Sequence, residues 1–578
     1  MRRGGIVVAL GLLLSPLATT SAPGSLAPLS PAEQAAQWTT LERTIVAGED
    51  PELLAYAPGQ PRVTRTLGWD SVGSGPLRRL GGFKHLSDIH VVDEESPARV
   101  EFLDECSTPF SAAYRPHEAM SLQVGNQMLR QLARIENGPA TGIPLKFAIS
   151  TGDNIDNNQL NEQQWFIRLL DGREVNPNSG DETYDGYTRE QFAGAPSDEV
   201  LELAQEPFGS VGTKIPWYGV LGNHDGLMQG NSPSNASFEA IATGGLKPFT
   251  PLDGFEDCPD DPEDGDAIED ALMNALNTDA RAVPADPDRH TLTHEELVET
   301  FFESPTKPKG HGLARAPQDS MHGSRGGYYG FKAGQRIRGI SLDTISYDGV
   351  ANGHIPDPQF LWLEEQLKRW SKKYYEDDTL TPNPDAKNRL IMIFSHHSSP
   401  TLNNPGANPA GAPYHCFTET DQPECADGEG LKTLLQRFPN VIAWVNGHEH
   451  GNAIRPFEAP ADTDPARGFW EINTAAHIDW PQQSRIIEVG WKTGETAEDP
   501  DTVFIYTTTL DHRAPLKPNE DTQSPRDFLT SFSRVESFID ACQRTGQANC
   551  AAAGTEEDQN TKLTQKAPFN LTWVRRGR

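Results

Sequence analysis

Five short polar clusters in the sequence carry residue types that bind transition metals and transfer protons. Each cluster follows an apolar run, and together they combine imidazoles, carboxylates and one side-chain amide. Such a mixture of nitrogen and oxygen donors suits Zn²⁺, Fe or Mn²⁺. The clusters are Asp88-Ile89-His90, Gly152-Asp153-Asn154-Ile155-Asp156, Gly222-Asn223-His224-Asp225, His396-His397 and Gly447-His448-Glu449-His450. Seven or eight donors are too many for one ion and suit two ions that share a bridging carboxylate.

The spacing within the clusters indicates how the donors could converge. Asp88 and His90 are two residues apart, so in extended backbone both side chains would face the same way, and residues 448–450 repeat this spacing. Asp153 follows Gly152, where the missing side chain lets the backbone turn and approach an ion. Each cluster alone is typical of a polar turn, whereas their combination predicts a dinuclear metal site.

The apolar runs before the clusters are continuous, which is typical of strands buried on both faces. Apolar stripes at helical spacing predict amphipathic helices near residues 124–135 and 358–367, and a short helix near 267–277. We expect strands at residues 80–87, 147–151, 215–221, 390–395, 441–445, 469–472, 484–489 and 502–507. The last three follow one another without helices between them. The layout predicts an α/β fold with four layers, an α/β/β/α sandwich.

The first residues have a basic start, a short apolar run and a small-residue end, which is typical of a secretory signal peptide. The apolar run is far shorter than the ~20 residues that span a bilayer, although an N-terminal membrane anchor is the alternative. No later run reaches that length, so we expect no transmembrane segment after signal removal. The expected organisation is a signal peptide at 1–22, an N-terminal extension at 23–78, the main α/β domain at 79–512 with a long acidic insertion at 226–327, and a polar C-terminal extension at 513–578.

The cysteine content also fits an exported protein. The chain has six cysteines, an even number, and no C-x-x-C pattern of a zinc site. We expect at least one intrachain disulfide, first of all Cys416–Cys425, because these two residues are close in sequence. Cys542 and Cys550 form a second local pair.

The formal net charge of −33 bears on the possible partners of the protein. A strongly acidic surface repels nucleic acid and anionic membranes, so we expect no stable nucleic-acid binding. A polyanionic substrate would have to be attracted locally, most plausibly by bound metal ions. The sequence makes no prediction of the oligomeric state.

The order of the clusters, D-x-H, G-D-x-x-D, G-N-H-D, H and G-H-x-H, resembles the calcineurin-like metallophosphoesterase superfamily, which includes the purple acid phosphatases. The resemblance extends from about Phe83 to Asp511, leaves the insertion unmatched, and is greatest to a secreted, actinobacterial-type branch. No motif position is substituted, which argues against an inactive homologue. The resemblance implies that the protein binds two divalent or trivalent transition-metal ions.

The resemblance also implies a role for each cluster residue. One ion would be held by Asp88, His90 and His450, the other by Asn223, His396 and His448, and both by Asp153. Of the two adjacent histidines, His396 is preferred as a ligand because it directly follows the apolar run, and His397 is the alternative. Asp156, Asn154 and Asp225 would support the ligands or the catalytic imidazole.

By the same resemblance, the function would be a secreted phosphoesterase that acts on a small phosphate ester. A hydroxide bridging the two ions would attack phosphorus in line, and His224, as imidazolium oriented by Asp225, would protonate the leaving oxygen. The alternative is a non-catalytic exported or cell-surface binding protein with structural metals. His224, which lies among the ligands without being one, favours the enzyme.

The sequence does not distinguish monoester from diester substrates. We expect the groups that select the substrate to come from the insertion, since loops carry most specificity determinants. Three of its residues could reach a phosphate but fit ordinary surface positions better: His311, His322 and Arg325.

Overall fold

The structure of the protein is a computed structural model. This structure describes residues 29–49, 53–69, 72–104, 106, 110, 112–181, 183–251, 258–259, 264–376, 378–402, 430–496, 499–544 and 550–570. The expected signal peptide at 1–22 and the Cys416–Cys425 pair lie outside the described residues, so both stay predictions.

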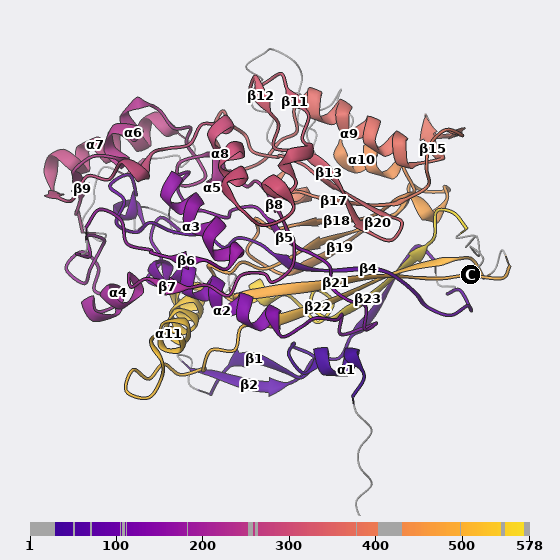
Figure 1. Ribbon diagram of the computed structural model, residues 1–578, viewed down its shortest axis with the longest axis horizontal. Coiled ribbons are helices and arrows are strands. Elements are labelled where there is room, and N and C mark those ends of the chain that lie inside the picture. Colours follow the sequence, from indigo (N-terminus) through magenta and orange to yellow (C-terminus); the bar gives the residue numbers. More distant parts are fainter. Residues whose placement is uncertain are drawn as a thin grey trace, which may run out of the picture.

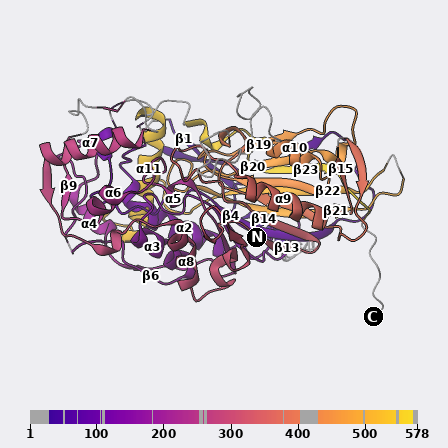
Figure 2. The same ribbon diagram turned by 90° about the horizontal axis from the view of Figure 1, so that it is seen from above.

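Two large β-sheets form the framework of the fold, and their strands are drawn in Figures 1 and 2. The seven-stranded sheet has, in spatial order, β3 (Val63–Leu67), β23 (Thr561–Lys566), β22 (Thr502–Asp511), β21 (Gln483–Lys492), β4 (Arg78–Leu86), β5 (Ala148–Thr151) and β8 (Trp217–Val220). The six-stranded sheet has β13 (Tyr329–Gly334), β14 (Ile337–Ser341), β17 (Leu390–Phe394), β18 (Val441–Asn446), β20 (Phe469–Asn473) and β19 (Ala453–Phe457). Strands β4, β5 and β8 are parallel to one another, as are β14, β17, β18 and β20.

The two sheets pack against each other through buried aromatic rings. Phe83 of β4 stacks on Phe147 at 4.9 Å and contacts Phe394 of β17 edge-on at 5.6 Å. Phe147 also contacts Phe331 of β13, with ring centroids 5.6 Å apart. These rings belong to one core cluster that includes residues of both sheets. Such edge-on and stacked aromatic pairs add to the free energy gained from burial.

Helices pack against both sheets. The helices are α1 (Pro31–Ala36), α2 (Ser121–Ala133), α3 (Leu160–Asp171), α4 (Asp198–Ala204), α5 (Asn223–Gly226), α6 (Ala236–Ala242), α7 (Gly265–Thr278), α8 (His294–Thr300), α9 (Asp357–Trp370), α10 (Leu431–Gln436) and α11 (Pro525–Ile539). Leu363 of α9 and Leu434 of α10 are fully buried with Trp444 of β18 in one cluster. Leu129 of α2 and Phe166 of α3 are buried in the same core as the seven-stranded sheet. The α/β class expected from the sequence is confirmed.

The expected helices and strands are present, and smaller elements lie around them. The stripe at 124–135 falls on α2, the 358–367 stripe on α9, and the 267–277 segment on α7. The two-stranded pairs are β1 (Arg43–Ala47) with β2 (Leu54–Pro58), β6 (Glu174–Val175) with β7 (Phe208–Gly209), β9 (Leu246–Pro248) with β10 (Ala280–Ala282), β11 (Gln318–Asp319) with β12 (Ser324–Arg325), and β15 (Lys373–Glu376) with β16 (Thr379–Pro382). In the part of the chain described, no helix is long and apolar enough to cross a bilayer.

The seven-stranded sheet extends beyond the domain boundaries expected at residues 79 and 512. β23, from the C-terminal extension, pairs antiparallel with β22, and β3, from the N-terminal extension, pairs parallel with β23. Both strands are short and rich in threonine and charged residues, so they lack the continuous apolar pattern that marks the central strands. Each extension therefore contributes one strand to the sheet.

The insertion at 226–327 is folded and packs on the loop that follows β4. Its helices α6 and α7 lie together at one end of the molecule in both views (Figures 1 and 2). Phe238 and Leu272 of these helices form a cluster with Val100 and Leu103 of the loop. A disulfide joins Cys106 of the loop to Cys258 of the insertion, and a second joins Cys542 to Cys550. The latter is the local pair expected from the sequence.

Candidate metal centre

The five clusters start where parallel strands end. They follow β4, β5 and β8 in one sheet and β17 and β18 in the other. Because the carboxyl ends of parallel strands open onto one edge of a sheet, ligands commonly bind there. The structure brings the clusters of both sheets together at such an edge.

The backbone at the clusters is left-handed and not extended. We expected extended backbone at Asp88-x-His90, and the structure differs: Asp88, His90, Asp153, His448 and His450 have φ angles of 51°, 45°, 46°, 72° and 52°. L-residues rarely adopt this conformation, and it is costly unless the surrounding structure maintains it. The strands end before the clusters, and a sharply turned backbone directs the donors toward one another.

Two glycines permit the close approach of these turns. A Cβ at Gly447 would collide with the Ser87 hydroxyl and the Asp88 carboxylate. Gly152 has a φ of +93°, and a Cβ there would lie 2.7 Å from His396 Nδ1. The glycines therefore let the backbone of one sheet approach the side chains of the other.

The first donor group consists of Asp88, His90, Asp153 and His450, whose donor atoms all lie within 4.8 Å of one another. The Nε2 atoms of His90 and His450 face each other at 3.2 Å. His90 Nε2 is 3.5 Å from Asp153 Oδ2, and His450 Nε2 is 3.5 Å from Asp88 Oδ1. Three of these four residues are those assigned to one ion, and Asp153 is the one assigned to both.

The second donor group is centred on His396, whose Nε2 lies 3.0 Å from Asp153 Oδ2 and 3.0 Å from Asn223 Oδ1. His448 Nδ1 lies 3.2 Å from the same nitrogen. The Asn223 amide donates from Nδ2 to the carbonyl of Gly230, which turns its oxygen toward the group. Asp153 thus contacts both groups.

His397 is also close, since one of its ring nitrogens lies within 4.8 Å of a ring nitrogen of His396 and of His448. Its hydrogen bonds direct it elsewhere: Nδ1 pairs with the Thr344 hydroxyl at 2.8 Å and Nε2 with the carbonyl of Ala351 at 2.9 Å. Burial and the neighbouring His396 lower the pKa of His397 to about 3, so the ring is neutral. With both nitrogens engaged, it has no donor left for an ion, and the geometry favours His396.

Two chains of buried charges orient the ligands. His90 Nδ1 pairs with Asp156 Oδ1 at 2.8 Å, and Asp156 Oδ2 accepts from Arg99 at 2.5 Å. In parallel, His450 Nδ1 pairs with Asp479 at 2.6 Å, and Asp479 lies 3.1 Å from the Arg115 guanidinium. Each Nδ1 therefore holds a hydrogen and each Nε2 lone pair points into the first donor group.

These charge chains fix the ionisation of the two carboxylates. Burial alone would raise the pKa of Asp156, but the Arg99 guanidinium and the His90 hydrogen bond hold it well below its ordinary value. Burial would likewise raise the pKa of Asp479, but the Arg115 guanidinium outweighs this effect and holds the pKa well below its ordinary value. Both carboxylates are therefore charged near neutral pH.

Asp479, Arg99 and Arg115 were not identified from the sequence. Asp479 lies six residues beyond the end of β20, so no strand-end signal marks it, and only the folded chain brings it to His450. The arginines lie in loops without regular spacing, and only the folded chain brings them to the carboxylates.

His224 borders the first donor group without joining it. Its ring centroid is 4.5 Å from that of His90, and its backbone N–H donates to Asp153 Oδ1 at 3.0 Å. Its Nδ1 lies 2.7 Å from the backbone carbonyl of Asp156. A carbonyl only accepts, so Nδ1 carries the hydrogen and Nε2 is left for a substrate. The side chain is 19% exposed.

Asp225 does not orient His224, contrary to the role assigned to it. Its carboxylate accepts from the backbone N–H groups of Gly222, Asn154 and Ile155 and from the Asn154 amide, at 2.8 to 3.1 Å. The short helix α5 directs the side chains of residues 224 and 225 to different sides, so adjacency in sequence does not make them partners. The Asp156 carbonyl orients His224 instead, and Asp225 and Asn154 brace the two ligand loops against each other.

The three candidate phosphate contacts of the insertion lie outside the donor groups. His311 is fully buried and stacks on Trp217 at 3.2 Å. His322 stacks on His294 at 3.8 Å. Arg325 pairs with Glu299 at 3.5 Å. His311 is therefore a core residue and not the surface residue expected, whereas His322 and Arg325 are partly exposed.

Comparisons with known proteins give only remote similarity. No protein-family model matches the chain, and no curated protein matches it. The solved structure of PhoD has 10% identity and a TM-score of 0.30, covering 84% of this chain and 82% of that chain. GAP50, the anchor in the inner membrane complex of Plasmodium, has 11% identity and a TM-score of 0.26, covering 79% of this chain and 95% of that chain. The chemistry of the site therefore rests on its own residues.

The donor set suits two cations. The nitrogens of His90 and His450 face each other, as do those of His396 and His448, each pair at 3.2 Å. Two imidazole lone pairs repel unless a proton or a cation lies between them, and a carboxylate, Asp153, is close to both pairs. Imidazoles, carboxylates and one amide oxygen are the donors that Zn²⁺, Fe and Mn²⁺ accept in proteins.

Proposed function

We propose that the protein is an exported phosphoesterase that depends on two transition-metal ions, in the calcineurin-like superfamily that its motifs resemble. The observation that carries this proposal is the shared position of Asp153, which lies 3.5 Å from His90 Nε2 and 3.0 Å from His396 Nε2. One carboxylate thereby reaches both donor groups. Paired ions of this kind polarise a phosphate ester and activate water for in-line attack.

The proposal includes the four-layer α/β/β/α arrangement of that superfamily. The face-to-face packing of the two sheets, with α9 and α10 outside one sheet and α2 and α3 against the other, supports it. Two disulfides in the described residues fit an oxidising compartment outside the cytoplasm.

The chain supplies three functions around the ions. Asp88, Asn223 and the four ligand histidines would hold the ions, and Asp153 would bridge them. Asp156 and Asp479 keep the His90 and His450 lone pairs directed inward. His224 Nε2 would donate a proton to the leaving oxygen of the ester, while the Asp156 carbonyl holds the other side of the ring.

The test is metal analysis of the purified full chain, combined with assays on aryl phosphate monoesters and diesters. We expect about two transition ions per chain, loss of hydrolysis with a chelator, and recovery when Zn²⁺, Mn²⁺ or Fe is returned. Active protein with almost no metal would refute the proposal. Metal-loaded protein that hydrolyses neither ester class would support the alternative, a binding protein with structural metals.

A further inference from the structure

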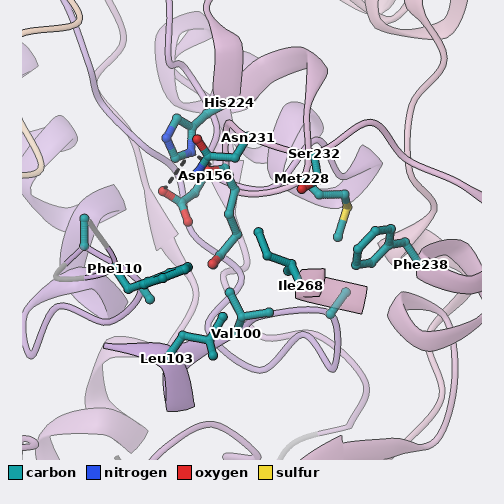
Figure 3. Close-up of a pocket in the computed structure, with 14 residues that line it drawn as sticks. Val100, Leu103, Phe110, Asp156, His224, Met228, Asn231, Ser232, Phe238 and Ile268 are labelled. Carbon is teal, nitrogen blue, oxygen red and sulfur yellow. Dashed lines mark hydrogen bonds and ion pairs between the residues drawn. The ribbon is translucent and has the colours of Figure 1, made fainter. Parts of the chain in front are cut away.

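A mostly apolar pocket of about 100 Å³ adjoins the candidate metal centre (Figure 3). Its apolar lining is formed by Val100, Leu103, Phe110, Met228, Phe238 and Ile268, and the polar residues Gln229, Asn231 and Ser232 complete one side. His224 and Asp156 line the same pocket and lie together at one edge of it in Figure 3. The pocket is therefore continuous with the residues that would act on a substrate.

Two segments far apart in sequence form the walls of this pocket. One wall is made by the described residues 98–103, 110, 112 and 113 of the loop after β4, and the other by the insertion with α6 and α7. The Cys106–Cys258 disulfide joins the two walls covalently. Their fixed relation means that the pocket exists before a ligand binds, which lowers the entropy lost on binding.

A buried lysine joins the same two segments a second time. Lys247 of β9, in the insertion, is fully buried. Its Nζ donates to the carbonyls of Glu94 and Ser96 at 3.1 and 2.8 Å and to the Glu101 carboxylate at 2.7 Å. Charge-assisted hydrogen bonds of this kind are strong in a buried setting.

The position of His224 decides which part of a substrate can enter the pocket. Its ring lies 4.5 Å from His90 of the first donor group and also lines the pocket. If the phosphoryl group lies over the donor groups and the leaving oxygen faces His224 Nε2, the carbon chain on that oxygen is directed into the pocket. An apolar lining would repel a charged or strongly hydrated leaving group.

We propose that this pocket binds the alcohol portion of the substrate, and that the substrate is a phosphate ester of a short apolar alcohol. The inference rests on the proposed phosphoesterase function and names its substrate class. The volume is about three times the ~30 Å³ of one water molecule and below the ~150 Å³ of a cavity that admits benzene. A short alkyl chain therefore fits better than an aromatic ring.

The reaction balances with water as the only co-reactant. The bond between phosphorus and the alcohol oxygen breaks, and a bond from phosphorus to a water oxygen forms. The leaving oxygen takes a proton from His224 Nε2, and the proton released by the attacking water restores the imidazolium through solvent. The apolar alcohol leaves through the pocket mouth.

The first experiment compares methyl, ethyl, propyl, butyl, octyl and phenyl phosphates, and the methyl diesters of the same alcohols, on the metal-loaded full chain. Each buried methylene should raise kcat/KM by about threefold to fourfold. We expect this rise from methyl to butyl, and no further rise for octyl or phenyl. Hydrolysis without a rise from methyl to butyl would overturn the inference while leaving the phosphoesterase function intact.

Variants of α7 locate the effect in the pocket. Ile268 is 7% exposed and lines the pocket, whereas Met273 of the same helix is 41% exposed and does not. Ile268→Phe should flatten the dependence on chain length, and Ile268→Ala should shift the preference toward longer chains or phenyl. Met273→Phe is the matched control and should keep the wild-type dependence. If kcat/KM depended equally on chain length in the folded Ile268 and Met273 variants, the assignment of the pocket would be refuted.

A binding measurement separates this inference from the proposed function. Calorimetric titration with methyl-, butyl- and octylphosphonate, which are not hydrolysed, should show affinity rising from methyl to butyl and no further. If no ester is hydrolysed but this gradient appears, the enzyme proposal fails and the ligand class of the pocket stands. If neither hydrolysis nor the gradient appears, both are wrong.

Discussion

Asn223 and His224 are neighbours in the chain and contact different groups. The Asn223 oxygen faces His396 at 3.0 Å, whereas His224 is anchored by the Asp156 carbonyl at 2.7 Å. We expect His224→Ala to keep both ions and to slow the chemical step by ~10²–10⁴-fold, the usual contribution of a general acid. The loss should be smaller for a nitrophenyl ester, whose leaving group needs little protonation. Metal analysis and single-turnover rates test this.

Asn223→Ala is the matched control for that experiment. It should weaken the second ion, and added metal should restore its activity, because only a ligand is lost. If His224→Ala lost metal as Asn223→Ala does, or hydrolysed an alkyl ester at the wild-type rate, the proton-donor role would be wrong.

The pKa of His396 determines how we expect metal binding to depend on pH. Burial lowers its pKa, but the Asp153 carboxylate outweighs this effect and raises the pKa to about 9. In the metal-free protein the ring therefore holds a proton below pH 9, which an incoming ion must displace. We expect at least one proton to be released per chain on Zn²⁺ loading at pH 7, and affinity to fall by up to about tenfold per pH unit as the pH is lowered.

Proton release can be measured by titrating Zn²⁺ in two buffers of different ionisation enthalpy. His396→Gln should release fewer protons, whereas His397→Gln should release as many as the wild type, since His397 is already neutral with a pKa of about 3. Metal uptake without proton release at pH 7 would contradict the prediction.

The residues that sequence reasoning could assign are those whose role is visible locally. Asp88, His396 and His448 follow apolar strands, so residue type and strand position together predicted a donor. Asp225 was misassigned because its partner was inferred from adjacency, while the α5 turn separates it from His224. Asp479 was missed because its role arises only where the segment after β20 meets His450 in the folded chain.

At the scale of elements, the segment after β20 acts on the metal centre through one carboxylate. Asp479 pairs with His450 Nδ1 and with the Arg115 guanidinium. Asp479→Asn should leave the fold intact but lower affinity for the first ion by about 10–100-fold, the usual cost of losing a carboxylate partner of a ligand histidine. Competition with a chromogenic chelator measures the affinity. Asp462→Asn, at an exposed residue of the turn after β19, is the control, and equal affinities in the two variants would exclude an orienting role for Asp479.

The central strands were easier to predict than the boundaries of the domain that contains them. β17 and β18 are continuous apolar runs buried along their whole length, and their short length and apolar composition identify them. β3 and β23 consist mainly of threonine and other polar residues and lie at the far side of the sheet, where pairing with a distant segment decides whether a strand forms. Their place in the sheet therefore required the structure.

At the scale of the whole molecule, the C-terminal extension should contribute to global stability. Leu563 of β23 is fully buried in the main core, whereas the neighbouring Lys562 is partly exposed. Leu563→Ala should lower the free energy of unfolding by ~2–5 kcal/mol, the range for a buried leucine. Lys562→Ala should change it by less than ~0.5 kcal/mol. Urea unfolding of the metal-free chain measures the free energy of unfolding of both variants. Equal unfolding midpoints for the two variants would mean that β23 does not contribute to global stability.

The convergence of ligands from both sheets has a consequence for how the protein is made. His90 and His450, whose nitrogens face each other, are separated by 360 positions in the chain. A chain that has emerged from a ribosome or a translocation channel only as far as β18 cannot present both, so the paired site forms only after residues up to His450 are available. Ion identity would then be decided in the compartment where folding finishes, by the ions that circulate there, because affinity alone discriminates poorly among first-row metals.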